Sequence, residues 1–244
     1  MLDWLTARPI AHRGLHDAAA GVIENTASAF DAAIAGRYGI ESDVQISRDG
    51  EAMVHHDDAL GRLTDGSGRL ADLSASELKA VSFKATGDRM LTLGELCQRV
   101  AGRTALVIEL KSHDDGDLRL ARRCAQVLAD YAGHAAVMSF DPALIEILRT
   151  IAPALPRGIV AEHAPLHFLR ARPHFIAYSV KNLPAAAPFI ARKLLSLPLL
   201  TWTVRSGEDR RQAARWADQI IFEGIRRNGR TDDQLGANFG LKWS

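Results

Sequence analysis

Acidic residues and a pair of histidines occur together in residues 41–57, which read Glu-Ser-Asp-Val-Gln-Ile-Ser-Arg-Asp-Gly-Glu-Ala-Met-Val-His-His-Asp. Residues 40–46 are rich in β-branched side chains and predict a strand. Because successive side chains of a strand point to opposite faces, Glu41 and Asp43 would share one face. Carboxylates beside an imidazole can transfer protons or bind a ligand, so this stretch is a candidate site.

The turn within this stretch decides which histidine joins the carboxylates. Asp49-Gly50 is a strong hairpin signal, and the connection is too short for a parallel crossover, so residues 52–56 should run back antiparallel. If Asp49 and Gly50 are the two loop residues, His56 lies opposite Asp43 and shares its face, while His55 points to the other face. The alternative is that these polar residues are merely exposed on a solvated hairpin, and this stretch alone leaves both open.

Apart from the return arm of this hairpin, strands and helices alternate along the chain. Strands are predicted at residues 9–12, 40–46, 105–111, 136–140, 157–160, 175–180, 199–204 and 219–223, and helices at 24–36, 92–100, 118–131, 142–151, 165–170, 184–195 and 207–216. Eight such units in 244 residues predict a TIM (β/α)8 barrel. An open doubly wound sheet is the alternative, but its glycine-rich phosphate loop is missing after the first strand. Residues 58–90 are irregular and predict an insertion within a single domain of residues 1–244.

In a TIM barrel the chemistry lies at the carboxyl ends of the strands. The ends of the first three predicted strands carry His12 and Arg13, Glu41 and Asp43, and Glu109 and Lys111. Glu109 and Lys111 share a face by the same two-residue spacing. A single charged residue at a strand end is usually a surface residue, but this many ionisable groups on neighbouring strands predict one site.

The composition excludes several classes of function. The net charge is +1 and the basic residues are scattered, which argues against a nucleic-acid partner. Cys97 and Cys124 fall in predicted amphipathic helices and should be reduced core residues. No run of about 18 apolar residues is present to span a membrane. A strand that begins near Ile10 leaves no room for a signal peptide, so we expect a cytoplasmic protein. The polar tail after Arg226 is expected to pack beneath the barrel or at the contact of a homodimer.

Several short motifs occur together in a characteristic order. They are His12-Arg-Gly14, Glu24-Asn-Thr26, Glu41-x-Asp43, Val54-His-His-Asp57, Ile108-Glu-Leu-Lys111, Ser139-Phe140 and Trp202-Thr-Val204. In this order and spacing the chain resembles the glycerophosphodiester phosphodiesterases from its first strand to at least Thr203. The resemblance implies a TIM barrel that hydrolyses a small glycerophosphodiester to glycerol 3-phosphate and an alcohol.

The resemblance also implies roles for particular residues. It implies metal ligands at Glu41, Asp43 and Glu109, acid/base histidines at His12 and His56, and phosphate contacts at Arg13 and Lys111. Trp202 would stack on the glycerol or alcohol group or fill the core. Glu24 would contact the catalytic groups or simply favour the start of a helix. Three carboxylates without a thiolate favour one hard divalent cation, Mg²⁺ or Ca²⁺.

Two positions depart from the family pattern. The last strand ends in Ile220-Ile-Phe-Glu223 where an Ile-Ile-Thr-Asp-like end is usual, and Arg205 stands where Asn usually follows Trp-Thr-Val. Neither affects the implied metal ligands or histidines, so these departures concern the shape of the substrate. Two other functions stay open: a phosphodiesterase acting on lysophospholipids or sphingomyelin, and a non-catalytic ligand-binding barrel. Neither the departing alcohol nor the physiological metal follows from the sequence.

Overall fold

The barrel predicted from the sequence is present in the structure, a computed structural model that describes residues 2–113, 115–163 and 171–224. Its parallel strands are β1 (Ile10–Ala11), β2 (Gly39–Ile46), β4 (Leu106–Leu110), β5 (Ala135–Ser139), β6 (Arg157–Ala161), β7 (Phe175–Ser179), β8 (Leu199–Val204) and β9 (Gln219–Phe222). They pair in the order β1-β9-β8-β7-β6-β5-β4-β2, and β1 also pairs with β2, which closes the barrel. Closure leaves none of these parallel strands as an edge.

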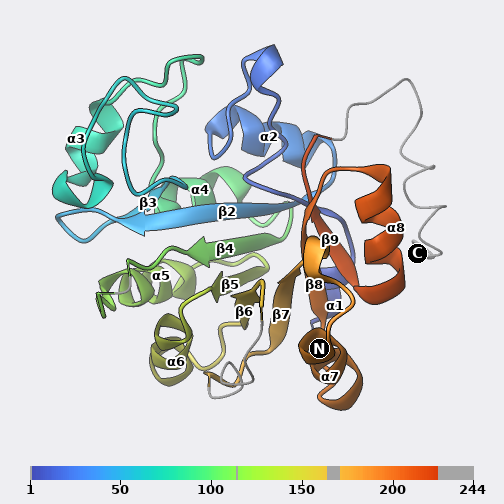
Figure 1. The fold of residues 1–244 in the computed structure, drawn as a ribbon. Coiled ribbons are helices and arrows are strands. Elements are labelled where there is room, and N and C mark those ends of the chain that lie inside the picture. Colours follow the sequence, from blue (N-terminus) through green and yellow to red (C-terminus); the bar gives the residue numbers. More distant parts are fainter. Residues whose placement is uncertain (1, 114, 164–170, 225–244) are drawn as a thin grey trace.

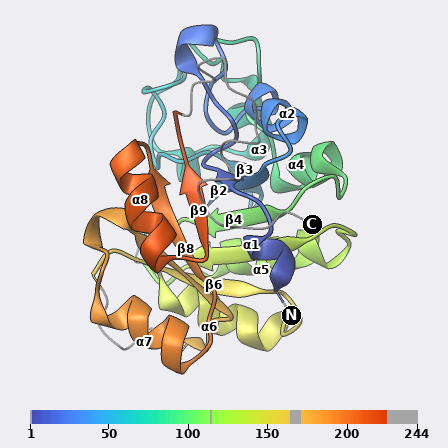
Figure 2. The same ribbon diagram turned by 90° about the vertical axis from the view of Figure 1, so that its right-hand side faces the viewer.

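Helices accompany the strands of this barrel, most of them on its outside (Figures 1 and 2). They are α1 (Asp3–Thr6), α2 (Ala27–Ala35), α3 (Ala75–Ala80), α4 (Leu93–Val100), α5 (Arg119–Ala129), α6 (Pro142–Ile151), α7 (Ala186–Leu194) and α8 (Gly207–Trp216), with short 3-10 turns at Ala18–Ala20, Leu70–Asp72 and Val180–Asn182. A capping box begins α4, because the Thr92 hydroxyl accepts from the Glu95 N–H and the Glu95 carboxylate accepts from the Thr92 N–H. The helix predicted at 165–170 and the tail after Arg226 lie outside the described residues.

The core has two layers, one inside the barrel and one between strands and helices. The interior layer contains Ile10, Val107, Ala136, Met138, Val160, Phe175, Ala177, Leu200 and Ile221. Helix α1, absent from the expectations, adds Leu5 to this layer, and Trp4 stacks on His134 just before β5. Because α1 directly precedes β1, it covers the amino end of the barrel.

The predicted register of the hairpin is wrong by one residue. Strand β3 (Ala52–Val54) runs antiparallel to β2 with Val44 opposite Val54 and Ile46 opposite Ala52. The loop therefore has one residue more than expected: Gly50 has φ +85° and its N–H donates to the Ser47 carbonyl over 3.1 Å. A glycine with positive φ after such a turn adds one residue to a hairpin loop.

The shifted register changes which histidine lies opposite Asp43. The His55 N–H, not that of His56, donates to the Asp43 carbonyl, over 3.1 Å. Strand β3 ends at Val54, so the alternation of faces does not extend to either histidine.

Residues 58–90 connect β3 to α4 and contain α3. They contribute to a separate apolar cluster of Ile23, Met53, Leu60, Leu70, Leu78, Phe83 and Met90. The segment is therefore anchored to the hairpin by its own small core. Within the described part of the chain, every helix is too short or too polar to cross a membrane.

Candidate active site

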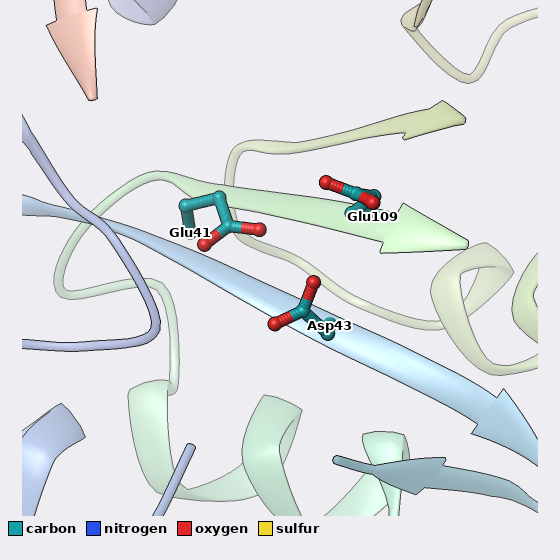
Figure 3. A group of neighbouring side chains, drawn as sticks. All are labelled: Glu41, Asp43 and Glu109. Carbon is teal, nitrogen blue, oxygen red and sulfur yellow. The ribbon is translucent and has the colours of Figure 1, made fainter. Parts of the chain in front are cut away.

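Three buried carboxylates meet where β2 and β4 run side by side. Asp43 pairs with Glu109 in the strand register, and Glu41 pairs with Val107. Glu41 and Asp43 are both 0% exposed and Glu109 is 6% exposed. One oxygen from each lies within 4.8 Å of the others, and Figure 3 shows the three side chains on the same side of the two strands. The two-residue spacing thus brings these acids together as expected.

Burial makes this arrangement electrostatically costly. Burial and the charges of Asp43 and Glu109 raise the pKa of Glu41 well above its usual value. Burial and the Asp43 charge raise the pKa of Glu109 to about 7. Burial also acts to raise the pKa of Asp43, but the nearby charges of Lys111 and Arg13 hold it well below its usual range. A cation placed among these oxygens would relieve their mutual repulsion.

Arg13 reaches this cluster because of the turn that follows β1. Arg13 and Gly14 have φ of +56° and +79°, and a Cβ on Gly14 would lie 2.8 Å from the Cβ of Ala29. Only glycine fits there without strain. The turn aims the Arg13 N–H at Glu41 Oε2 over 2.9 Å. The Arg13 guanidinium donates to Glu24 Oε1 over 2.7 Å, and its Nε lies 3.3 Å from Asp43 Oδ2.

Asn25 orients Asp43, a role that the sequence analysis missed. Asn25 Nδ2 donates to Asp43 Oδ2 over 2.9 Å, while Asn25 Oδ1 accepts from the Ser42 hydroxyl over 2.9 Å. Asn25 has φ +56°, a conformation that Asn tolerates better than most residues. Thr26 is the N-cap residue of α2. The polar run Glu-Asn-Thr at residues 24–26 is the sequence feature that could have indicated this role.

Lys111 bridges two of the acids. Its Nζ lies 2.8 Å from Asp43 Oδ1 and 2.5 Å from Glu109 Oε1. Burial lowers the pKa of Lys111, but the charges of Asp43 and Glu109 outweigh it and raise that pKa overall. Lys111 is therefore cationic at neutral pH.

His12 lies between two carboxylates. Its Nδ1 hydrogen-bonds Glu223 Oε1, and its Nε2 lies 3.8 Å from Glu41 Oε2. Glu223 Oε2 accepts from Arg205 Nε over 2.6 Å. Burial opposes ionisation of Glu223, but the bonds from His12 and Arg205 lower its pKa to about 2. Glu223 and Arg205, the two departures noted in the sequence, thus form one pair behind His12, and the expectation that neither departure affects the histidines is wrong because β9 places Glu223 beside β1.

The two adjacent histidines have different surroundings. His56 Nδ1 lies 2.8 Å from Asp57 Oδ1, and the His56 carbonyl accepts from Gln45 Nε2 over 2.7 Å. His55 is 2% exposed, and its ring centroid lies 6.4 Å from that of Phe83 in the insertion. Burial lowers the pKa of His55.

A cavity of about 300 Å³ opens at the carboxyl ends of the strands. It is lined by His12, Arg13, His56, Glu109, Lys111, Met138, Phe140, Glu162, Trp202, Thr203, Arg205 and Ile221. Trp202 meets Phe140 edge to face, with ring centroids 5.5 Å apart. Both candidate acid/base histidines, both candidate phosphate contacts and one carboxylate of the acidic cluster thus border one space.

A closed (β/α)8 barrel with ionisable groups gathered at its strand ends defines the class: a TIM barrel with an enzyme-like site. The model of the glycerophosphoryl diester phosphodiesterase family matches residues 12–225, and the chain belongs to this family. The family suggested by the sequence motifs is therefore confirmed.

Individual relatives agree with this assignment. YhdW of Bacillus subtilis is 31% identical over 160 residues, and the match covers 62% of this chain and 64% of YhdW. The glycerophosphodiester phosphodiesterase of Caldanaerobacter subterraneus is 40% identical over 111 residues, which cover 42% of this chain and 44% of that protein. The chain thus spans less than two thirds of the length of either relative. The fold is like that of an Oleispira antarctica phosphodiesterase solved with the product sn-glycerol-3-phosphate: TM-score 0.77, 21% identity, 88% of this chain and 91% of that one.

Proposed function

We propose that this chain hydrolyses glycerophosphodiesters to glycerol 3-phosphate and an alcohol, using His12 and His56 as the acid/base pair and one divalent cation. The observation that carries the proposal is the single cavity bordered by both histidines, Arg13, Lys111 and Glu109. A phosphodiester anion needs cations, and Arg13 supplies a planar fork while Lys111 supplies a point charge. Cleavage of a P–O bond needs a base for the nucleophile and an acid for the leaving alkoxide.

His12 suits the role of base. Because Glu223 holds the Nδ1 side, the proton of the neutral ring sits on Nδ1 and the Nε2 lone pair is free. Nε2 would take the proton of the attacking hydroxyl, and the Glu223 carboxylate would stabilise the imidazolium that forms. By resemblance to the family, that hydroxyl belongs to the substrate's own glycerol, and water then opens a cyclic phosphate.

His56 suits the role of acid. Asp57 holds its Nδ1 in the same way, so a protonated ring presents Nε2–H for transfer to the departing alkoxide. In the second step the roles reverse, because opening the cyclic phosphate needs a base for water. Trp202, which packs edge to face with Phe140, would contact the glycerol or alcohol group.

The acidic cluster fits a hard cation. Glu41, Asp43 and Glu109 offer oxygen atoms alone, and Glu41 Oε1 is buried with no hydrogen-bond partner in the described part of the chain. A bound divalent cation would supply electrostatic stabilisation of charge on the phosphoryl oxygens. The proposal includes Mg²⁺ or Ca²⁺ as the ion and, from the sequence, the cytoplasm as the compartment.

Product analysis tests the proposal. The purified protein is incubated with a panel of glycerophosphodiesters and lysophospholipids, with and without a chelator. We expect glycerol 3-phosphate from the glycerophosphodiesters and its loss on chelation. Turnover of lysophospholipids alone would favour the lipid-directed alternative. Saturable binding without product would identify a ligand-binding barrel and overturn the proposal.

A further inference from the structure

A continuous series of ion pairs and hydrogen bonds joins Arg13, the proposed phosphate contact, to His56, the proposed acid, through an arginine of the insertion. Arg13 donates to Glu24 Oε1 over 2.7 Å, and Arg62 Nη2 donates to the same oxygen over 2.6 Å. Arg62 Nε lies 2.5 Å from Asp57 Oδ2, and Asp57 Oδ1 lies 2.8 Å from His56 Nδ1. One guanidinium therefore holds the carboxylates that support two separate functional groups.

Arg62 contacts each carboxylate twice. Beyond the two shortest contacts, Nη1 donates to Glu24 Oε2 over 3.3 Å and Nη2 to Asp57 Oδ1 over 3.0 Å. Such paired contacts fix the orientation of both carboxylates, not merely their charge. Arg62 is absent from the lining of the cavity, so it would act through its partners and not on the substrate.

We propose that Arg62 is a positioning residue that couples phosphate binding by Arg13 to proton donation by His56. This inference rests on the proposed function. Glu24 fixes the direction of the Arg13 guanidinium, and Asp57 fixes the ring and tautomer of His56. Because a single side chain from residues 58–90 orients both, the insertion carries a part of the catalytic geometry.

A purely structural role predicts something different. The Arg62 side chain is 47% exposed, and exposed ion pairs contribute little to folding stability. Arg48 offers a matched control, because it makes an exposed ion pair with Glu77 over 2.8 Å and contacts none of the groups that line the cavity. If Arg62 were only another surface ion pair, Arg62→Gln and Arg48→Gln would behave alike.

The test uses steady-state kinetics on two substrates. Glycerophosphocholine has a leaving group that needs a proton, whereas a nitrophenyl glycerophosphodiester has one that departs without it. For Arg62→Gln we expect kcat on glycerophosphocholine to fall by about 10²-fold, the usual cost of misplacing a reacting group by about 1 Å. On the nitrophenyl ester its kcat should recover most of that loss, because His56 is not needed. Its KM should rise on both substrates, because Arg13 is less well held.

Two further variants keep the result interpretable. Arg62→Lys retains the positive charge but lacks the planar guanidinium that contacts both carboxylates. Its kcat and KM should therefore lie between those of wild type and Arg62→Gln. Arg48→Gln should match wild type on both substrates. Equal kinetics of Arg62→Gln and Arg48→Gln, or an equal kcat loss on both substrates with unchanged KM, would overturn the proposal.

A second readout does not depend on turnover. In ¹⁵N-histidine NMR spectra, with His56→Ala used for assignment, the neutral His56 ring should carry its proton on Nδ1 in wild type and become a mixture of tautomers in Arg62→Gln. An unchanged tautomer in the variant would overturn the proposal. If wild type hydrolyses neither diester, the proposed function fails, and the NMR result alone decides the role of Arg62.

Discussion

His55 and His56 are neighbours in the chain, yet alanine at each position should have opposite consequences. His56→Ala removes the proposed acid, so we expect kcat on glycerophosphocholine to fall by about 10²–10⁴, or about 3–5 kcal/mol in the barrier. The His56 side chain is 32% exposed, and its loss should change stability little. His55 is 2% exposed and packs near Phe83, so His55→Ala should cost about 1–3 kcal/mol of unfolding free energy.

Two measurements separate these effects. The release of glycerol 3-phosphate gives kcat, and a thermal melt gives stability, where each kcal/mol corresponds to about 2–4 °C in a chain of this size. His56→Ala should lose activity at an unchanged melting temperature, while His55→Ala should melt earlier with its kcat nearly intact below that transition. Equal losses of kcat in the two variants would refute the assignment of His56 as the acid and His55 as a packing residue. So would a His55→Ala protein that melts at the wild-type temperature but has a low kcat.

Three other predictions follow from the site. Glu109→Gln should weaken divalent-cation binding in titration calorimetry and lower activity with it, with partial recovery in excess metal; full wild-type activity after thorough chelation would contradict this. His56→Ala should lose far less kcat/KM on a nitrophenyl glycerophosphodiester than on glycerophosphocholine, while His12→Ala should lose similar amounts on both; rescue of His12→Ala instead would exchange the two roles. Burial lowers the pKa of His55, so just below about pH 6.5 the unfolded chain binds a proton more readily than the native one. The free energy of unfolding should therefore decrease as the pH is lowered through this range. Urea unfolding between about pH 7 and about pH 5 should show a shallower fall for His55→Gln, and parallel curves would disprove the contribution.

Local sequence was enough to predict the barrel and much of the candidate site. The strands are short apolar runs separated by helices of ordinary length, and eight such units close in one familiar way. Glu41 and Asp43, like Glu109 and Lys111, are two residues apart in a strand, so one face must carry both members of each pair. Because β2 and β4 are neighbouring parallel strands, these two faces lie side by side, and Asp43 pairs with Glu109.

Other features depended on contacts that no local pattern encodes. Asp49-Gly50 is compatible with hairpin loops of two or three residues, and the positive φ of Gly50 in the longer one shifted the register. The placement of His56 beside the cavity then came from the chain after β3, not from strand alternation.

The longest-range contacts depended most on closure of the barrel. Glu223 reaches His12 across 211 positions only because β1 pairs with β9, and Asn25 reaches Asp43 only because the turn after β1 folds over β2. Such partners lie far apart in the chain and share no sequence period. The sequence therefore determined which groups stand at the strand ends, while the tertiary structure decided which carboxylate or amide orients each of them.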